Sequence, residues 1–396
     1  MGQHVSVARQ PLARCSRSAR TGMASQYFIN FPLQHWTLCL PFTNSDGANP
    51  SGKLTLSGNT LYGTTQYGGS SGWGTIFRIN TDGSDFTVLK SFTSADGQVP
   101  LAGLTLASNT LYGTTSTSGD YGGGTVFKIN TNGSGYAVLK HCNNSDGRNP
   151  NAGLILSGNI LYGTTSAGGS SVYGTVFKIN TDGNDYTVLK NFTSGDAKTP
   201  NSSLTLSGNT LYGTTRQSNP GYGAVFKINT DGSGYTVLKY FLASDGESPQ
   251  AGLTLSGNTL YGTTYSGGPA VGTVFKINTD GSGFCILKSC NNNDGALPQA
   301  DLTLSGSTLY GTMTVGGVSG LGVVFALTAP PLTIARSGED VVLAWPTNAI
   351  CFVLQSTTNL ISPAWSTVSP APAIVNGQYT VINPAAGTQR FYRLAN

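Results

Sequence analysis

The chain has 396 residues, of which 10% are charged, and a formal net charge of +4. Soluble domains usually carry about 25% charged residues, so Ser, Thr, Asn and Gly must cover most of this surface. No apolar run reaches the roughly 18 residues that a membrane-spanning helix needs, which excludes a transmembrane segment of that kind.

The first 33 residues match nothing else in the chain and contain no acidic residue. Arginines at positions 9, 14, 17 and 20 account for the net positive charge, so the chain from Gln34 onward is neutral. Three interpretations remain open: a disordered or wrongly assigned start with Met23 as another initiator, an unusual export signal, or a nucleic-acid-binding arm. Because nucleic-acid affinity depends on clustered Lys and Arg, we expect no nucleic-acid partner.

The motif LYGTT at Leu61 recurs, almost unchanged, with a period of about 50 residues, which is the mark of a repeat architecture. The other copies begin at Leu111, Leu161, Leu211, Leu260 and Leu309. In the third copy, four short β-rich runs separated by turn residues predict strands a to d at Leu154–Leu156, Ile160–Thr165, Thr175–Asn180 and Tyr186–Phe192. Val188 and Leu189 break the alternation of strand d, as expected of a strand that is buried on both faces.

Four antiparallel strands per repeat and no helical periodicity indicate an all-β fold, a six-bladed β-propeller spanning residues 34–328. The sixth copy stops after strand c, whereas Trp36–Phe42 matches a strand d with nothing before it. We therefore expect this N-terminal strand to complete the last blade and close the ring, which removes two exposed sheet edges.

Most acidic residues occupy repeated Asp positions, in the SDG-like loop after strand d or in the NTDG turn between strands c and d. Asp before Gly is turn chemistry, so we predict structural roles for these residues. Of the others, Asp301 and Glu247 could in principle converge across adjacent blades. No catalytic motif occurs, and we predict no catalytic residue, no metal and no cofactor.

The six cysteines contain no CxxC pair and suggest no disulfide framework. Cys142 and Cys290 replace the Phe of strand d found in other repeats, so we expect them to be small buried hydrophobic residues. With only His4, His35 and His141 available, a metal site built from Cys and His is not expected.

The turn NTDGSGYTVL at Asn229 resembles the Asp-box of sialidase-like propellers, which is a structural turn in that family. A closer resemblance covers Gln34–Leu327: LYGTT, a Gly-rich loop and GTVFKINTDGSGYTVLK are similar to the tandem repeat family called GloVer, named for Gloeobacter and Verrucomicrobia. That resemblance implies a secreted or cell-surface protein, without an implied enzymatic activity or ligand. The low charge content also favours an extracellular location.

The connections between strands b and c vary in sequence, whereas the a–b and c–d turns are nearly constant. Variation on a repeated scaffold predicts a recognition surface. Aromatic side chains on these loops can stack on sugar rings or anchor a protein partner. The alternative for Trp73, Tyr173 and Tyr222 is packing against neighbouring blades. The candidate ligand-binding residues are Tyr67, Trp73, Tyr121, Tyr173, Tyr222 and Tyr265.

After the stiff segment Ala329–Pro331, residues 332–396 predict a small β-sandwich. WP, LQSTTNL and RFYRL resemble fibronectin-III-like modules at the C-termini of exported bacterial proteins. We expect strands at Asp340–Trp345, Cys351–Ser356, Trp365–Val368, Tyr379–Ile382 and Arg390–Leu394, and a core containing Trp345, Trp365, Phe391 and Tyr392.

The sequence thus predicts a monomeric, non-catalytic extracellular scaffold that binds a polysaccharide or a surface protein. Two alternatives remain open, a propeller-type glycosidase or lyase and a purely structural surface component. Unique carboxylates or a bound metal in the central channel would favour an enzyme, and exposed aromatic rings would favour sugar binding.

Overall fold

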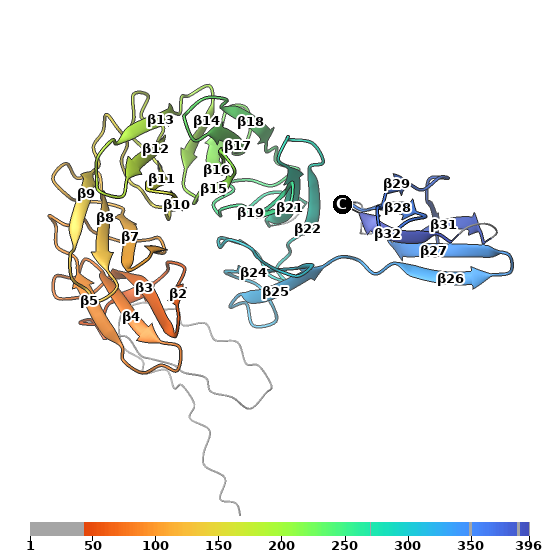
Figure 1. Cartoon of the computed structure of the whole chain (residues 1–396), viewed down its shortest axis with the longest axis horizontal. Helices are drawn as coiled ribbons and strands as arrows, with labels where there is room; N and C mark the ends of the chain where they lie inside the picture. The colour runs from red at the N-terminus through yellow and green to blue at the C-terminus, as the bar shows by residue number, and fades with distance from the viewer. Residues whose placement is uncertain (1–42, 270, 348–350, 386–388, 396) are drawn as a thin grey trace, which may run out of the picture.

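The computed structural model describes residues 43–269, 271–347, 351–385 and 389–395, which form β-strands and loops without a helix. Figure 1 shows sheets following one another around an arc, with the short first strands toward its centre, and a separate pair of sheets at the C-terminal end. Every strand pair within the sheets is antiparallel. This arrangement is β-propeller-like.

Each repeat forms one sheet, and the sheets are numbered here in chain order. In the first, β1 and β2 pair with opposite ends of β3; in the fourth, β14 and β15 do the same with β16. The first sheet contains β1 (Ala48–Pro50), β2 (Thr55–Ser57), β3 (Thr60–Tyr67), β4 (Thr75–Asn80) and β5 (Thr87–Ser91). The second contains β6 (Thr105–Ala107), β7 (Thr110–Thr115), β8 (Thr125–Asn130) and β9 (Ala137–His141). The third contains β10 (Ile155–Ser157), β11 (Ile160–Thr165), β12 (Thr175–Asn180) and β13 (Thr187–Asn191).

The later repeats follow the same plan. The fourth sheet contains β14 (Ala197–Pro200), β15 (Thr205–Ser207), β16 (Thr210–Ser218), β17 (Ala224–Asn229) and β18 (Thr236–Tyr240). The fifth contains β19 (Thr254–Ser256), β20 (Thr259–Thr264), β21 (Thr273–Asn278) and β22 (Cys285–Ser289). The sixth contains β23 (Thr303–Ser305), β24 (Thr308–Met313) and β25 (Val323–Thr328). In the third sheet, strands b and c have the predicted bounds and strand a is shifted by one residue.

A β-bulge recurs at one place in the first five sheets and explains the broken alternation of strand d. In the third sheet Val176 pairs with Lys190, but the next residue, Phe177, pairs with Val188. Leu189 is therefore the extra residue of the bulge, and its side chain packs on the core shared with the fourth sheet. The apolar pair Val188–Leu189 thus reflects a bulge as well as burial on both faces.

The glycine of LYGTT is required by a close approach across the sheet. A Cβ at Gly163 would lie 2.6 Å from Cζ of Phe177 on the neighbouring strand and 2.8 Å from Cδ2 of Leu154. Both distances are shorter than van der Waals contact, so a side chain here would displace the Phe ring from the core. The glycine at this position keeps the aromatic ring of strand c flat against strand b.

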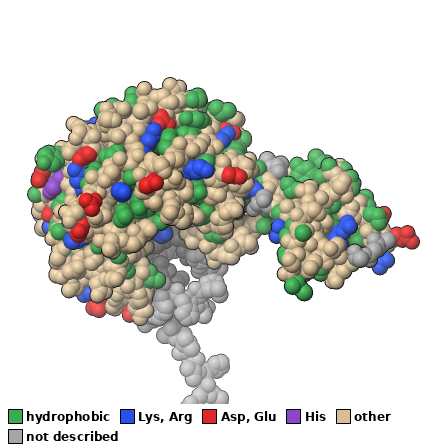
Figure 2. All heavy atoms as spheres, turned by 45° about the horizontal axis from the view of Figure 1, so that its top comes forward, with side chains coloured by type: hydrophobic (Ala, Val, Ile, Leu, Met, Phe, Trp, Pro, Cys, Tyr) green, Lys and Arg blue, Asp and Glu red, His purple; other side chains and the backbone are tan. Residues whose placement is uncertain are grey.

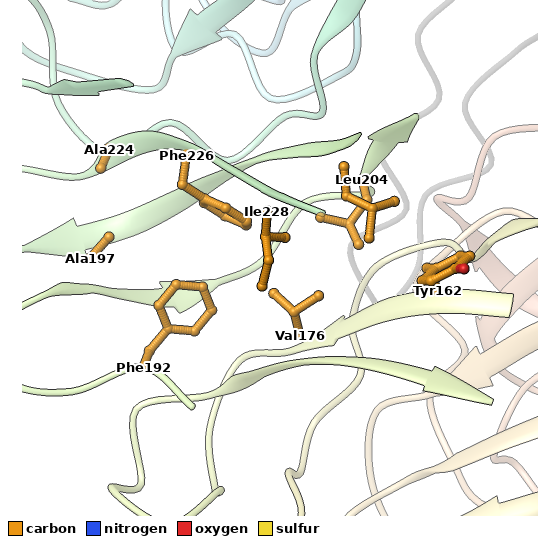
Figure 3. Packing of buried hydrophobic residues seen from close by; sticks show 9 residues of the cluster. Tyr162, Val176, Phe192, Ala197, Leu204, Ala224, Phe226 and Ile228 are labelled. Atoms are coloured by element: carbon orange, nitrogen blue, oxygen red, sulfur yellow. The ribbon is translucent and has the colours of Figure 1, made fainter. Parts of the chain in front are cut away.

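The hydrophobic cores lie between successive sheets, not within them. Between the third and fourth sheets, Tyr162 and Val176 of the third pack with Phe226 and Ile228 of the fourth, and Phe192 joins them (Figure 3). Phe192 and Phe226 meet edge-on with ring centroids 5.4 Å apart. The same pattern recurs between the other sheets that follow one another in the chain, so each of the four middle sheets contributes to two cores.

The sixth sheet has three strands within the described part of the chain. Its strand c, β25, alternates between half-buried and exposed residues, whereas β21 of the fifth sheet is buried almost throughout. The expected closing strand, Trp36–Phe42, lies outside the described residues.

The C-terminal region, residues 332–395, forms two sheets that share one core. Leu343, Trp345 and Val381 of one sheet and Leu354 of the other are buried together, with Tyr392 packed against them. This confirms Trp345 and Tyr392 as core residues. The first sheet contains β26 (Thr333–Ser337), β27 (Asp340–Pro346), β30 (Ala373–Val375) and β31 (Gln378–Pro384); the second contains β28 (Val353–Thr357), β29 (Ser366–Thr367) and β32 (Phe391–Ala395).

The prediction that Trp365 and Phe391 belong to this core was wrong. Both are only half-buried and lie outside the cluster. The guanidinium of Arg393 lies 4.2 Å from the centroid of the Trp365 ring. A cation stacked on its face lets the indole remain partly exposed.

Candidate ligand-binding face

The array has two different faces, as the strand order requires. On one, the a–b and c–d turns meet, because Thr181 N–H donates to the carbonyl of Asn159 at 2.9 Å. On the other, the b–c loops meet the segments that leave strand d of the preceding sheet, because Gly169 N–H donates to the carbonyl of Asn144 at 3.0 Å. We call the second the loop face. It carries the variable connections and all six candidate aromatic residues.

Most of the candidate aromatic residues are exposed. The exposed fraction is 44% for Tyr67, 41% for Trp73, 68% for Tyr121 and 50% for Tyr222. Tyr265 is half-buried. The alternative of packing against neighbours therefore does not describe Trp73 and Tyr222, whose side chains are available to a ligand.

Tyr173 differs from the others because it packs against the core between the third and fourth sheets. Nζ of Lys198 lies 5.2 Å from its ring centroid. Among the residues that the structure describes, no ring contact joins any two of the six candidates. The structure thus presents separate aromatic positions on neighbouring sheets, not one continuous stacking platform.

The repeated Asp residues have the structural roles predicted for them. In the NTDG turn, Ser84 N–H donates to Asp82 at 2.9 Å, and this hydrogen bond lowers the pKa of Asp82. In the loop after strand d, Thr93 N–H donates to Asp96 at 3.0 Å. These carboxylates satisfy backbone donors in turns.

The Asp of the exit loop also joins adjacent sheets through a repeated network. Nζ of Lys90 lies 2.8 Å from Asp96 and 4.3 Å from the centroid of the Tyr136 ring of the next sheet. Tyr136 O–H donates to the carbonyl of Asp96 at 3.3 Å. Burial opposes ionisation of Asp96, but the hydrogen bonds from Lys90 and Thr93 outweigh it and hold the pKa below its ordinary value. The strand d lysines therefore pair with the Asp of their own exit loop and lie over an aromatic ring of the next sheet, a more specific role than solvating the edges.

Figure 2 shows one view of the surface, where acidic and basic side chains are interspersed over the array. Ion pairs at equivalent positions join Lys140 to Asp146, Lys190 to Asp196, Lys239 to Asp245 and Lys288 to Asp294. Alternating charges of this kind do not produce a phosphate-binding patch.

The non-repeated carboxylates Asp301 and Glu247 do not share a hydrogen bond. Asp301 accepts the backbone N–H of Gly252 at 2.6 Å, and no hydrogen bond connects it to Glu247 in the described ranges. Within those ranges, no group of three or more His, Cys, Asp or Glu residues is positioned to hold a metal ion.

One covalent link was not predicted from the sequence. Cys285 on β22 forms a disulfide with Cys351, which precedes β28, with Cα atoms 5.8 Å apart. The expectation of no disulfide framework was therefore wrong for this pair. By contrast, Cys142 and Cys290 are free and fully buried, as predicted, and burial raises the pKa of Cys142 to about 12.

The disulfide holds the C-terminal region against the fifth sheet. Beside it, Nζ of Lys276 donates to the carbonyl of Cys351 at 3.1 Å and lies 5.8 Å from the Phe352 ring centroid. Burial lowers the pKa of Lys276 to about 8. A cavity of about 400 Å³ lies next to this contact, between Leu287, Leu309 and Leu327 of the fifth and sixth sheets and Phe352 of the C-terminal region.

Repeated four-stranded sheets, cores between sheets and a variable loop face define a β-propeller-like repeat protein. The sequence model of the Gloeobacter/Verrucomicrobia repeat matches residues 15–220 and 216–341. The chain belongs to this repeat family. No curated protein matches it.

Several solved structures are similar in fold. A putative 6-phosphogluconolactonase from Bacteroides uniformis is 16% identical, with 85% of this chain and 98% of that chain covered and a TM-score of 0.44. A gluconolactonase from Xanthomonas campestris is 14% identical, with 72% and 88% covered and a TM-score of 0.44. A nidogen/laminin complex is 18% identical, with 56% and 72% covered and a TM-score of 0.39. Over the described ranges, no helix has the length and apolar character needed to cross a membrane.

Proposed function

We propose that the array, residues 34–328, is a closed six-bladed propeller in which Trp36–Phe42 supplies the fourth strand of the sixth blade. These seven residues lie outside the described part of the chain, and the support comes from the two end sheets. Val324 of the sixth sheet is 47% exposed, whereas the equivalent Val274 of the fifth is fully buried. Leu54 of the first sheet is 47% exposed, whereas the equivalent Leu104 of the second is 6% exposed. The end sheets thus expose the two halves of a core that is buried between all other neighbours.

Charge at the inner positions supports the same closure. Position 53 of the first sheet corresponds to 103, 153, 203, 252 and 301 in the others, which are Gly or Ser except at the two ends. Neighbours at this position touch, since Gly153 N–H donates to Oγ of Ser203 at 3.1 Å and Gly252 N–H donates to Asp301. Ring closure would bring Lys53 and Asp301 together as an ion pair.

Cysteine cross-linking tests the closure. Lys53→Cys combined with Asp301→Cys is expected to form a disulfide on mild oxidation, because the Cβ atoms of neighbours at this position lie close together. Gly153→Cys with Ser203→Cys, adjacent in the structure, is the matched positive control, and Lys53→Cys with Ser203→Cys is the negative control. Cross-linking of the positive control alone would show an open array.

The proposed function is that of a non-catalytic extracellular scaffold that binds a polysaccharide through its loop face. The observation that carries this proposal is the exposure of Trp73, Tyr121 and Tyr222 on variable loops, whereas the tyrosine of the repeated LYGTT motif is buried in the first four sheets. Exposed rings suit stacking on sugars. The repeated carboxylates are used in turns and ion pairs. The non-repeated Asp120 of a b–c loop lies 3.4 Å from Nε2 of His141 on the same face.

The cysteine pair supports the extracellular location, because disulfides persist mainly in oxidising compartments. Residues 332–396 are proposed to be a fibronectin-III-like β-sandwich that acts as a spacer or attachment module. Its two sheets share a core around Trp345, and its disulfide to the fifth sheet fixes its orientation relative to the propeller.

Retention of the full chain on immobilised polysaccharides tests the function. Trp73→Ala and Tyr121→Ala are expected to lower retention, whereas Ile334→Ala, which removes an exposed side chain of the C-terminal region, is not. Shortening of the polysaccharide during incubation would instead indicate the glycosidase or lyase alternative. Absence of retention on every polysaccharide would contradict the proposal and favour a structural role.

A further inference from the structure

We infer that the loop face of the third and fourth sheets binds an anionic polysaccharide, through Arg148 and Lys198 on either side of Tyr173. This inference rests on the proposed function and specifies its ligand class. It starts from the basic residues of the array that lie outside the strand c and strand d positions at which most repeats carry Lys or Arg. These are Lys53, Arg148, Lys198 and Arg216.

The backbone places three of the inferred residues in one continuous row. Arg148 exchanges two backbone hydrogen bonds with Ala167, at 2.8 and 3.2 Å, across the third sheet. The next residue, Gly168, forms a β-bridge with Tyr173. Thr199 N–H of the fourth sheet then donates to the carbonyl of Tyr173 at 2.9 Å, which places Lys198 beside the ring. Arg216 extends the row on β16, where its neighbour Gln217 pairs with Lys198.

These cations differ from the lysines of strand d in having no carboxylate partner. Each strand d lysine of the first five sheets forms an ion pair with the Asp of an exit loop. Neither Arg148, Lys198 nor Arg216 forms an ion pair with a carboxylate in the described part of the chain. Arg148 and Arg216 are also exposed. Because the other repeats fold without a cation at these positions, the fold itself does not require them.

The chemistry of the row fits an acidic sugar polymer. Arg and Lys bind carboxylates or sulfates through charge-assisted hydrogen bonds, and the Tyr173 ring, packed against the core, supports the Lys198 ammonium beside it. Nearby amides add neutral polar groups, since Asn151 donates to Asn201 across the two sheets at 2.9 Å. The row ends at the fifth sheet, where Glu247 occupies the position of Lys198. Three cations bounded by an acid are too few for nucleic acid, which is held by many phosphate contacts.

The test measures dissociation constants of the full chain for polygalacturonate, dextran sulfate, neutral dextran and single-stranded oligothymidylate. Binding to polygalacturonate or dextran sulfate is expected, and comparison of the two identifies carboxylate or sulfate as the preferred anion. Arg148→Gln and Lys198→Gln are each expected to raise the dissociation constant about tenfold, which is the effect of losing one charge-assisted hydrogen bond. Lys128→Gln and Lys178→Gln remove the same charge near the turns of the opposite face and are the matched controls.

The outcomes separate this inference from the proposed function. Binding of neutral dextran alone, unchanged in Arg148→Gln and Lys198→Gln, would overturn the anionic site and leave the scaffold function intact. Absence of binding to all three polysaccharides would overturn both. Tighter binding of oligothymidylate than of either anionic polysaccharide would also overturn the inference, as would equal losses in the control variants.

Discussion

Thr215→Val is expected to stabilise the protein, although the equivalent substitution in the neighbouring sheet should destabilise it. In four sheets a buried pair of Thr hydroxyls joins strands b and c, as in Thr165 and Thr175 with their Oγ1 atoms 2.8 Å apart. The fourth sheet has Ala224 in place of the second Thr. Oγ1 of Thr215 is therefore buried with no hydrogen-bond partner in the described ranges.

The expected magnitudes follow from what each hydroxyl does. A buried polar group without a partner costs about 1–3 kcal/mol, so Thr215→Val should raise the free energy of unfolding by about 1 kcal/mol. Oγ1 of Thr165 accepts the backbone N–H of Thr175 at 3.1 Å besides bonding its hydroxyl. Thr165→Val leaves these groups unsatisfied and should lower the free energy of unfolding by about 2 kcal/mol.

Urea unfolding of both variants beside the wild type measures the effect, with an unchanged slope showing that only stability has altered. A third variant, Ala224→Thr, restores the missing hydroxyl and should also stabilise the protein. Destabilisation by Thr215→Val comparable to that of Thr165→Val would refute the reasoning, because it would mean that Thr215 has a partner.

Three further predictions concern the C-terminal junction and the free thiols. Replacing both Cys285 and Cys351 by Ser removes a cross-link across 66 residues. The free energy of unfolding should fall by about 4 kcal/mol, because the unfolded chain gains conformational entropy. Faster proteolysis between the array and the C-terminal region is expected, and unchanged proteolysis would count against a stabilising role. Burial lowers the pKa of Lys276 from 10.5 to about 8, so the unfolded chain binds more protons between these values and the free energy of unfolding should rise over about pH 8–10. Lys276→Met should abolish that rise, and a rise that persists would exclude Lys276 as its source. Burial also raises the pKa of Cys142 to about 12 and of Cys290 to about 11. When the folded protein is treated with an alkylating reagent, peptide mapping should therefore find both thiols unmodified until the chain is unfolded. Rapid alkylation of the folded protein would disprove their burial.

The strand pattern and the turn chemistry could be predicted from the sequence because each repeats. Strands b and c of the third sheet have their predicted bounds, and the Asp residues of both turn types accept the expected backbone N–H groups. Because one assignment of strands and turns must fit every copy, an ambiguous segment in one repeat is resolved by the others. The bulge in strand d escaped prediction, because two adjacent apolar residues suit both a bulge and a doubly buried strand.

The features outside the repeat could not be derived in this way. Cys285 takes a position held by Thr236 in the preceding sheet, and its partner lies in a different region. Their pairing depends on how the two regions meet, which no local pattern encodes. Arg148 and Lys198 occupy equivalent positions of successive repeats, so the repeat alone places them on adjacent sheets. That they have no carboxylate partner among the described residues is seen only in the folded chain.

Hydrogen–deuterium exchange of the full chain, with and without saturating polygalacturonate, tests the central claim most directly. If the loop face binds the polysaccharide, slower exchange is expected in the b–c loops and exit segments of the third and fourth sheets, including peptides containing Arg148, Tyr173 and Lys198. The a–b and c–d turns of the same sheets should be unchanged. Protection confined to those turns or to the C-terminal region would contradict the account.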